Sequence, residues 1–298
     1  MKESRKLITI VALSLSAIAP SSADQYNLFQ KLPLIAGAYT NLNPEYKHIL
    51  RGREDETIWG YDDYNGPDKW AELDSNFYLC SEGMEQSPID IDPMTAIPKD
   101  LSDIGFFYQP TSVHIFNNGR TIELEYDPGS FIEIENIDYE LHQFHFHSHS
   151  EHTLALGARF DMEMHLVHLS IDPDSDTPVA VVTVFIREGE ENQILKRVWQ
   201  HLPIHEGNEF YLPFSLNIGD ALPTHRRTYR YKGSFTTPPC TEGVQWVVLK
   251  QPIEMSREQI EKFRKILNHS CCANNYRPIQ KINGRQIFFD TTQEGLPE

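Results

Sequence analysis

Histidines cluster in the middle of the chain at a spacing that suits a metal site. One residue separates His145 from His147, and His165 follows in the next strand-like run. Side chains alternate between the two faces of a strand, so His145 and His147 share a face. His165 joins them if the two strands pair as antiparallel neighbours. Three neutral imidazoles leave the fourth position of tetrahedral zinc open, which is the arrangement of catalytic zinc sites.

Two hydrogen-bonding residues precede the candidate ligands by two positions and share their face. Gln143 precedes His145, and Glu163 precedes His165. Each can fix an imidazole tautomer through the ring nitrogen that faces away from the metal. Simple alternation puts Glu140, His142, Phe144 and Phe146 on the opposite face. We interpret the remaining nearby histidines as structural or surface residues: His142, His149, His152 and His168.

The same residues allow a second interpretation, a cupin β-barrel. His145, His147, Glu151 and Gly157 are spaced nearly as in the first cupin motif, which binds iron or manganese. The match is imperfect, because the glycine expected before the first histidine is missing and Tyr139 stands near its place. No second cupin motif follows.

The elements that must position these residues are mostly strands. Short runs of β-type sequence are separated by turn signals such as Asn118-Gly119 and Asp127-Pro128-Gly129. We predict strands at Ser112–Asn117, Thr121–Tyr126, Phe131–Glu135, Tyr139–His147, Phe160–Ser170, Val179–Ile186 and Val244–Leu249. Helical periodicity predicts helices at Glu190–Leu202 and Ser256–Asn268, the second with a capping box at Ser256 and Gln259. The pattern indicates a mainly β single domain with peripheral helices.

The chain has 298 residues and a formal net charge of −17, which argues against nucleic acid and anionic membrane surfaces as partners. Residues 1–23 read as a signal peptide, with a basic start, a short apolar run and small residues at the cleavage site. That run is too short to span a bilayer, so we expect an exported protein without stable membrane insertion. We divide the remainder into a segment of unknown role (24–58), a domain (59–290) and a tail (291–298).

The four cysteines are Cys80, Cys240, Cys271 and Cys272, and they form no C-x-x-C motif. Four cysteines allow three pairings. A bond between adjacent cysteines is strained, so a long-range disulfide is expected in an exported chain. The cysteine positions by themselves leave its partners open.

From Trp59 to about Arg285 the chain resembles the α-carbonic anhydrase family, in its bacterial, exported form. The resemblance rests on segments that occur in the family's order and spacing: Trp59-Gly60-Tyr61, Asn65-Gly66-Pro67, Trp70, Gln86-Ser87-Pro88-Ile89-Asp90-Ile91, Asn117-Asn118-Gly119, Gln143-Phe144-His145-Phe146-His147, Ser150-Glu151-His152-Thr153, Glu163-Met164-His165-Leu166-Val167-His168, Gly233-Ser234-Phe235-Thr236-Thr237-Pro238-Pro239-Cys240 and Asn275-Tyr276-Arg277-Pro278. Several of these segments are weak alone, but their order makes the set specific.

The resemblance implies a role for each matching residue. His145, His147 and His165 are the zinc ligands, and Gln143 and Glu163 support them. Thr236 accepts the proton of a metal-bound hydroxide and passes its own to Glu151, while Thr237 belongs to the bicarbonate site. An apolar wall holds carbon dioxide, and Cys80 pairs with Cys240. The residues implied for this wall are Val167, Val181, Phe235, Val244 and Trp246.

The resemblance further implies a zinc lyase that reversibly hydrates carbon dioxide to bicarbonate and a proton, with weak esterase activity from the same hydroxide. The implied fold is one α/β domain on a central, largely antiparallel twisted sheet. The expected location is periplasmic or secreted, with a monomer or dimer both open. A non-catalytic relative that binds a partner is the rival from another class. Such relatives typically lose a zinc histidine, and none is missing here.

One position departs from the family's fast members. After Asn118-Gly119, where they often carry a proton-shuttling histidine, this chain has Arg120. Arginine does not deprotonate in proteins, so it cannot relay a proton. Tyr61, Asn118 and Glu123 remain as residues that can order a water chain. The departure affects the expected turnover rate and leaves the reaction unchanged.

Overall fold

The structure is a computed structural model, and it describes residues 59–172, 175–270, 272 and 274–292. Its strands are β1 (Asp90–Ile91), β2 (Ile97–Lys99), β3 (Gly105–Phe107), β4 (Val113–Asn117), β5 (Ile122–Tyr126), β6 (Phe131–Ile134), β7 (Ile137–His147), β8 (Thr153–Leu154), β9 (Met162–Ser170), β10 (Val179–Glu188), β11 (Glu209–Tyr211), β12 (Thr228–Ser234), β13 (Glu242–Met255) and β14 (Phe288–Asp290). Its helices are α3 (Trp70–Leu73), α4 (Leu79–Glu82), α5 (Gln193–Trp199), α6 (Arg257–Ser270) and the short 3₁₀ turns η1 (Ser75–Phe77) and η2 (Ile218–Ala221). The predicted signal peptide and the segment 24–58 lie outside the described residues.

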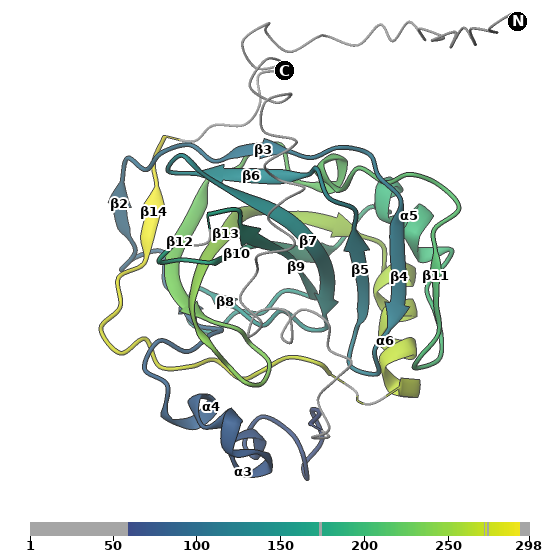
Figure 1. The fold of residues 1–298 in the computed structure, drawn as a ribbon, viewed down its shortest axis with the longest axis horizontal. Helices are drawn as coiled ribbons and strands as arrows, with labels where there is room; N and C mark the ends of the chain where they lie inside the picture. The colour runs from purple at the N-terminus through teal and green to yellow at the C-terminus, as the bar shows by residue number, and fades with distance from the viewer. Residues whose placement is uncertain (1–58, 173–174, 271, 273, 293–298) are drawn as a thin grey trace, which may run out of the picture.

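One large sheet organises the described chain. Ten of its strands follow the order β11-β4-β5-β7-β9-β10-β13-β12-β14-β2, and β6 and β3 extend it beside β7. Its pairs are antiparallel except β10 with β13 and β14 with β2. The long strands curve across the middle of the molecule, while α3 and α4 lie at its periphery (Figure 1). The expected single domain on a largely antiparallel twisted sheet is therefore confirmed.

The strands β5, β7, β9 and β10 match the sequence-based ranges to within two residues, while β13 extends six residues past its predicted end and helix α5 is shorter than predicted. The sequence did not predict the strands β1, β2, β3, β8, β11, β12 and β14. Helix α6 has the expected capping box, in which the Ser256 N–H donates to Gln259 Oε1 (3.0 Å) and the Gln259 N–H donates to Ser256 Oγ (3.3 Å). Helix α5 starts late because the Asn192 side chain accepts from the Leu195 N–H, which caps the helix there.

The two faces of β7 have different environments. The Phe146 ring centroid lies 4.9 Å from that of Trp199 in α5 and 6.0 Å from that of Phe263 in α6. This aromatic packing buries one face of the strand against helices. Alternation then turns His145 and His147 to the opposite face. Packing of Phe146 in the hydrophobic core thus orients His145 and His147 away from the helices.

The alternation predicted for β7 fails at one place. The pairing register between β7 and β9 shifts between Leu141 and Gln143, so His142 sits at an irregularity of the ladder. Leu141 consequently shares a hydrophobic cluster with Phe144. The prediction that Glu140 shares a face with Phe144 and Phe146 was wrong, because the extra residue at the irregularity reverses the alternation of the strand before it. The parity from Gln143 to His147 is unaffected.

A disulfide joins Cys80 in α4 to Cys240, 160 positions apart. Both cysteines belong to a small cluster with Trp59, Trp70 and Phe77. The pairing agrees with the one implied by the family resemblance. It fastens the N-terminal helices to the loop that follows β12. Cys271 is outside the described residues.

Replacing Cys80 and Cys240 together by alanine is expected to lower the free energy of unfolding by about 2–5 kcal/mol, because the unfolded chain regains the freedom of a long loop. Urea unfolding at pH 7 measures this change. An unchanged unfolding free energy would show that the bond adds nothing to the packed cluster.

Candidate metal centre

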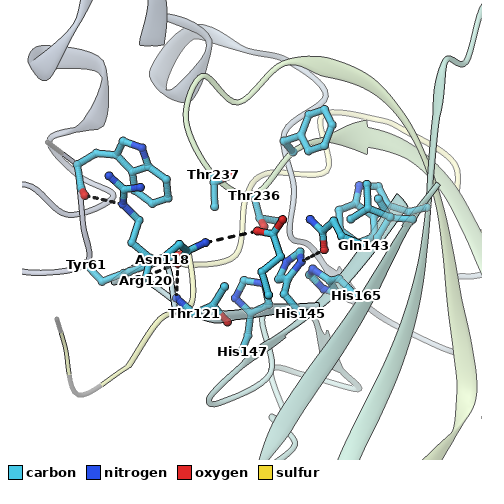
Figure 2. Close-up of a pocket in the computed structure, with 16 residues that line it drawn as sticks. Tyr61, Asn118, Arg120, Thr121, Gln143, His145, His147, His165, Thr236 and Thr237 are labelled. Atoms are coloured by element: carbon cyan, nitrogen blue, oxygen red, sulfur yellow. Dashed lines mark hydrogen bonds between the residues drawn. The ribbon is translucent and has the colours of Figure 1, made fainter. Parts of the chain in front are cut away.

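Three histidine side chains converge from two paired strands. His145 of β7 stands directly opposite His165 of β9, and His147 follows two residues later on the same face. Ring centroids are 5.0 Å apart for His145 and His147, 5.4 Å for His145 and His165, and 4.6 Å for His147 and His165. One nitrogen from each ring lies within 4.8 Å of the other two. Figure 2 shows the three rings together at one end of a cavity.

Each imidazole has an acceptor behind it. His145 Nδ1 lies 2.8 Å from Gln143 Oε1, and His165 Nε2 lies 2.5 Å from Glu163 Oε1. His147 Nδ1 donates to the backbone carbonyl oxygen of Asn275 at 2.7 Å. An acceptor on one ring nitrogen requires the proton there, so the other nitrogen keeps its lone pair. The nitrogens left for a metal are Nε2 of His145, Nε2 of His147 and Nδ1 of His165.

The donor set fits a metal cation. Nε2 of His147 is buried and has no hydrogen-bond partner in the structure, which is costly for a polar atom unless a ligand satisfies it. Burial lowers the pKa of both His145 and His165, so the rings are neutral at neutral pH. Three neutral nitrogens with an open fourth position suit zinc in a catalytic site. The prediction of a metal-binding histidine triad is thus compatible with the geometry.

A buried hydrogen-bond chain holds His165. Glu163 Oε1 also accepts from His152 Nδ1 at 2.7 Å, and Glu163 Oε2 accepts from the His152 N–H at 2.9 Å. His152 Nε2 then contacts the Tyr231 hydroxyl at 2.7 Å. Burial would raise the pKa of Glu163, but His152 and His165 outweigh it and hold that pKa well below its usual range. The carboxylate stays charged and fixes both rings.

Glu151 is fully buried beside the triad. Its Oε1 accepts from the Arg277 N–H at 2.8 Å, and its Oε2 lies 3.5 Å from Nε2 of His147 and 4.0 Å from Nδ1 of His165. Oε2 has no hydrogen-bond partner in the structure. The predicted contact from Thr236 to Glu151 is therefore not among the bonds present, and the relay between them stays a prediction.

The cavity above the triad has one apolar side. The cavity is lined by Val167, Val181, Phe235 and Trp246, which were all predicted for the apolar wall. Thr236 and Thr237 also line the cavity. Val244 was also predicted for the wall, but it is not among the lining residues. It packs in the same buried cluster as Val181 and Trp246. The structure thus brings four of the five predicted wall residues to the cavity.

Arg120 lies across the cavity from the histidines, near Tyr61 and Asn118 (Figure 2). Its Nε–H donates to the Trp59 carbonyl oxygen at 3.0 Å. Its guanidinium carbon stands 4.0 Å from the centroid of the Trp59 ring. A hydrogen bond and a cation–π contact therefore hold this side chain at the cavity lining.

The other nearby histidines do not join the triad. His168 is buried and contacts the Tyr108 hydroxyl at 2.9 Å, and burial lowers its pKa to about 3. His149 contacts Arg264, and His142 is only partly buried. His152 acts through Glu163, a role that its position in the sequence did not reveal. Asn275 and Arg277 were also missed as partners of His147 and Glu151, because they act through backbone atoms whose positions no residue type encodes.

Glu163→Gln is expected to lower the free energy of unfolding by about 1–3 kcal/mol at pH 7, because the amide NH₂ would then face buried N–H donors that a carboxylate oxygen accepts from in the wild type. The depressed pKa of Glu163 stabilises the fold above pH 4.5, and this stabilisation is lost as the pH falls below it. The variant should therefore show a weaker loss of stability on acidification. Urea unfolding at pH 7 and pH 4 measures both effects.

Glu125→Gln is the matched control, because Glu125 pairs with His114 at 2.8 Å while its side chain is 40% exposed. We expect a change of no more than about 1 kcal/mol at pH 7. Equal losses in the two variants would contradict the role given to burial.

Comparisons with known proteins agree with the geometry. The sequence model of the eukaryotic-type carbonic anhydrase family matches residues 65–291. A carbonic anhydrase of Nostoc sp. is 38% identical over 236 residues, covering 77% of this chain and 85% of that protein. One from Pectobacterium atrosepticum is 36% identical over 234 residues, covering 78% and 91%.

A solved structure of Thermovibrio ammonificans α-carbonic anhydrase, in complex with the inhibitor sulfanilamide, aligns with a TM-score of 0.73 and 38% identity. The alignment covers 78% of this chain and 99% of that one. These matches leave the cupin interpretation unsupported. The cupin interpretation also needs Glu151 as a metal ligand. His145, His147 and His165 form a group whose ligand atoms lie within 4.8 Å of one another, and Glu151 does not belong to it. The chain belongs to the eukaryotic-type, or α, carbonic anhydrase family.

Proposed function

We propose that this protein is a zinc-dependent lyase that reversibly hydrates carbon dioxide to bicarbonate and a proton. The observation that carries the proposal is the convergence of three imidazole nitrogens, each with an acceptor behind its ring, beneath an apolar wall. Family membership supports the reaction, and the intact triad favours an enzyme over a non-catalytic relative. The residues proposed to hold zinc are His145, His147 and His165.

Zinc, when bound, makes a hydroxide nucleophile available from water near neutral pH. The chain supplies everything else. Neutral imidazoles leave the ion its positive charge, which thiolates would reduce. Gln143 and Glu163 keep the proton on the far side of His145 and His165, so both rings stay oriented for binding.

The apolar wall suits a substrate without charge or dipole. Val167, Val181 and Trp246 offer carbon dioxide a hydrophobic recess within the same cavity as the histidines. We propose that Phe235 completes this recess, with Val244 packed in the supporting core. Thr237, also on the lining, is proposed to contact bicarbonate.

Thr236 and Glu151 are proposed to control a proton at the edge of the site. Glu151 is ionised in this role and accepts from the Thr236 hydroxyl, so that the threonine oxygen offers a lone pair toward the reacting oxygen. The Arg277 N–H supports this by holding one carboxylate oxygen, while the other has no hydrogen-bond partner and lies 3.5 Å from His147 Nε2. Thr236 lines the cavity and is buried, as the role requires.

The disulfide favours an oxidising compartment, so we propose a periplasmic or secreted protein. None of the helices in the described chain is long and apolar enough to cross a membrane. The signal peptide and the domain limits at 59 and 290 remain predictions.

His165→Ala should reduce bound zinc from about one per chain to near zero, because two imidazoles cannot close a three-histidine site. His168→Ala is the matched control, since His168 is equally buried on the same strand but bonds Tyr108. Metal analysis of the purified variants measures zinc, iron and manganese together. Equal zinc loss in both variants, or iron in the wild type, would contradict the assignment.

Arg120→His should raise the carbon dioxide hydration rate in low buffer by about tenfold. This is less than the 10²–10⁴-fold that well-placed proton-transfer groups contribute. Each turnover releases a proton that must leave the cavity, and histidine can carry it near neutrality while arginine cannot. We expect kcat/KM to change little. Stopped-flow hydration at increasing imidazole-type buffer measures this, and the wild-type rate should rise with buffer. A wild-type rate that ignores buffer would mean that another group carries the proton.

A further inference from the structure

Asn275 is a fully buried residue to which neither the resemblance nor the proposed reaction gives a role for its side chain. Its backbone carbonyl accepts from His147 Nδ1. That contact can orient the imidazole only if the carbonyl itself is held in place. The question is what fixes a backbone group in a stretch that lies outside the helices and strands of the described chain.

The carboxamide of Asn275 bonds to the residues on both sides of His147. Its Nδ2 donates to the Phe146 carbonyl oxygen at 2.9 Å, and its Oδ1 accepts from the Ser148 N–H at 2.8 Å. The Asn275 N–H also donates to the Ser148 carbonyl oxygen at 3.3 Å. One buried residue therefore binds the backbone before His147, the backbone after it, and the ring between them.

The same carboxamide also bonds the turn that precedes β5. Its Nδ2 donates a second hydrogen bond, at 3.0 Å, to the carbonyl oxygen of Arg120. The turn that carries Arg120 is thereby tied to the end of β7. Two donors and an acceptor on one short side chain are what these partners require, and among side chains of this length only asparagine supplies them.

We propose that Asn275 is a positioning residue for His147: its carboxamide locks the end of β7 and the Arg120 turn, so that its carbonyl holds the imidazole with Nε2 toward the metal. The inference rests on the proposed zinc function, because it concerns a proposed zinc ligand. It predicts that loss of the carboxamide weakens metal retention, although the three ligands remain and the carboxamide bonds named above all go to backbone atoms.

Asn275→Ala should bind zinc about 10–100-fold more weakly than the wild type, the range typical when a partner behind a metal ligand is lost, and should release zinc faster to a chelator. The visible spectrum of the cobalt-loaded variant should also change, because it reports ligand geometry. Asn275→Ser retains one hydroxyl and should give an intermediate release rate. It also provides the test if the alanine variant does not fold.

Asn117→Ala is the matched control. Asn117 is a buried asparagine whose Nδ2 donates to the Pro203 carbonyl and the Ser270 hydroxyl, and whose Oδ1 accepts from Gly119. It has no contact with a metal ligand among these bonds. Thermal unfolding should show both alanine variants destabilised, while zinc release from Asn117→Ala stays close to the wild-type rate.

Two results would overturn the inference: wild-type zinc release from the Asn275 variants, or equal acceleration in Asn117→Ala, which would make release a consequence of lower stability. The wild type is measured first, so the outcomes separate cleanly. A wild type that binds no zinc contradicts the proposed function. A wild type that binds zinc tightly, beside an Asn275 variant that does the same, contradicts only the positioning role.

Discussion

The site depends on one constraint: three imidazoles, two buried and one partly buried, must each present an unprotonated nitrogen to the same point. Gln143, Glu163 and the Asn275 carbonyl meet it by accepting the proton on the far side of each ring. Burial adds to this by keeping His145 and His165 neutral. A site organised in this way needs little rearrangement on metal binding, because folding of the sheet already orders its side chains.

The sheet orients the histidines because its two faces have different environments. Phe146 packs against α5 and α6, and this contact turns the adjacent histidines toward the cavity. Opposite pairing of β7 and β9 brings in His165, and pairing of β9 with β10 places Val181 opposite Val167. The metal ligands and the apolar wall therefore come from adjacent, rigid strands. A shift of one residue in the pairing of β7 with β9 would turn His165 to the face opposite His145.

The face of β7 that carries the ligands could be predicted from the sequence, because alternation along a strand is a local pattern. His145, His147 and Gln143 could be placed on one face, and the capping box of α6 could be located, from neighbouring residues alone. The irregularity at His142 was missed because an inserted residue leaves no mark on composition. Asn275 and Arg277 were missed as partners because they contribute backbone atoms from a segment more than 120 positions along the chain. Val244 shows the remaining limit, because the family resemblance implied a place for it on the apolar wall, whereas it packs in the buried cluster with Val181 and Trp246.

The most direct test of the account is carbon dioxide hydration by the purified protein, followed by stopped flow before and after metal removal. We expect activity in the protein as isolated, loss of activity after dialysis against a zinc chelator, and full recovery on addition of one equivalent of zinc. Recovery with iron or manganese but not zinc, or hydration that persists in protein shown to be free of metal, would contradict the account.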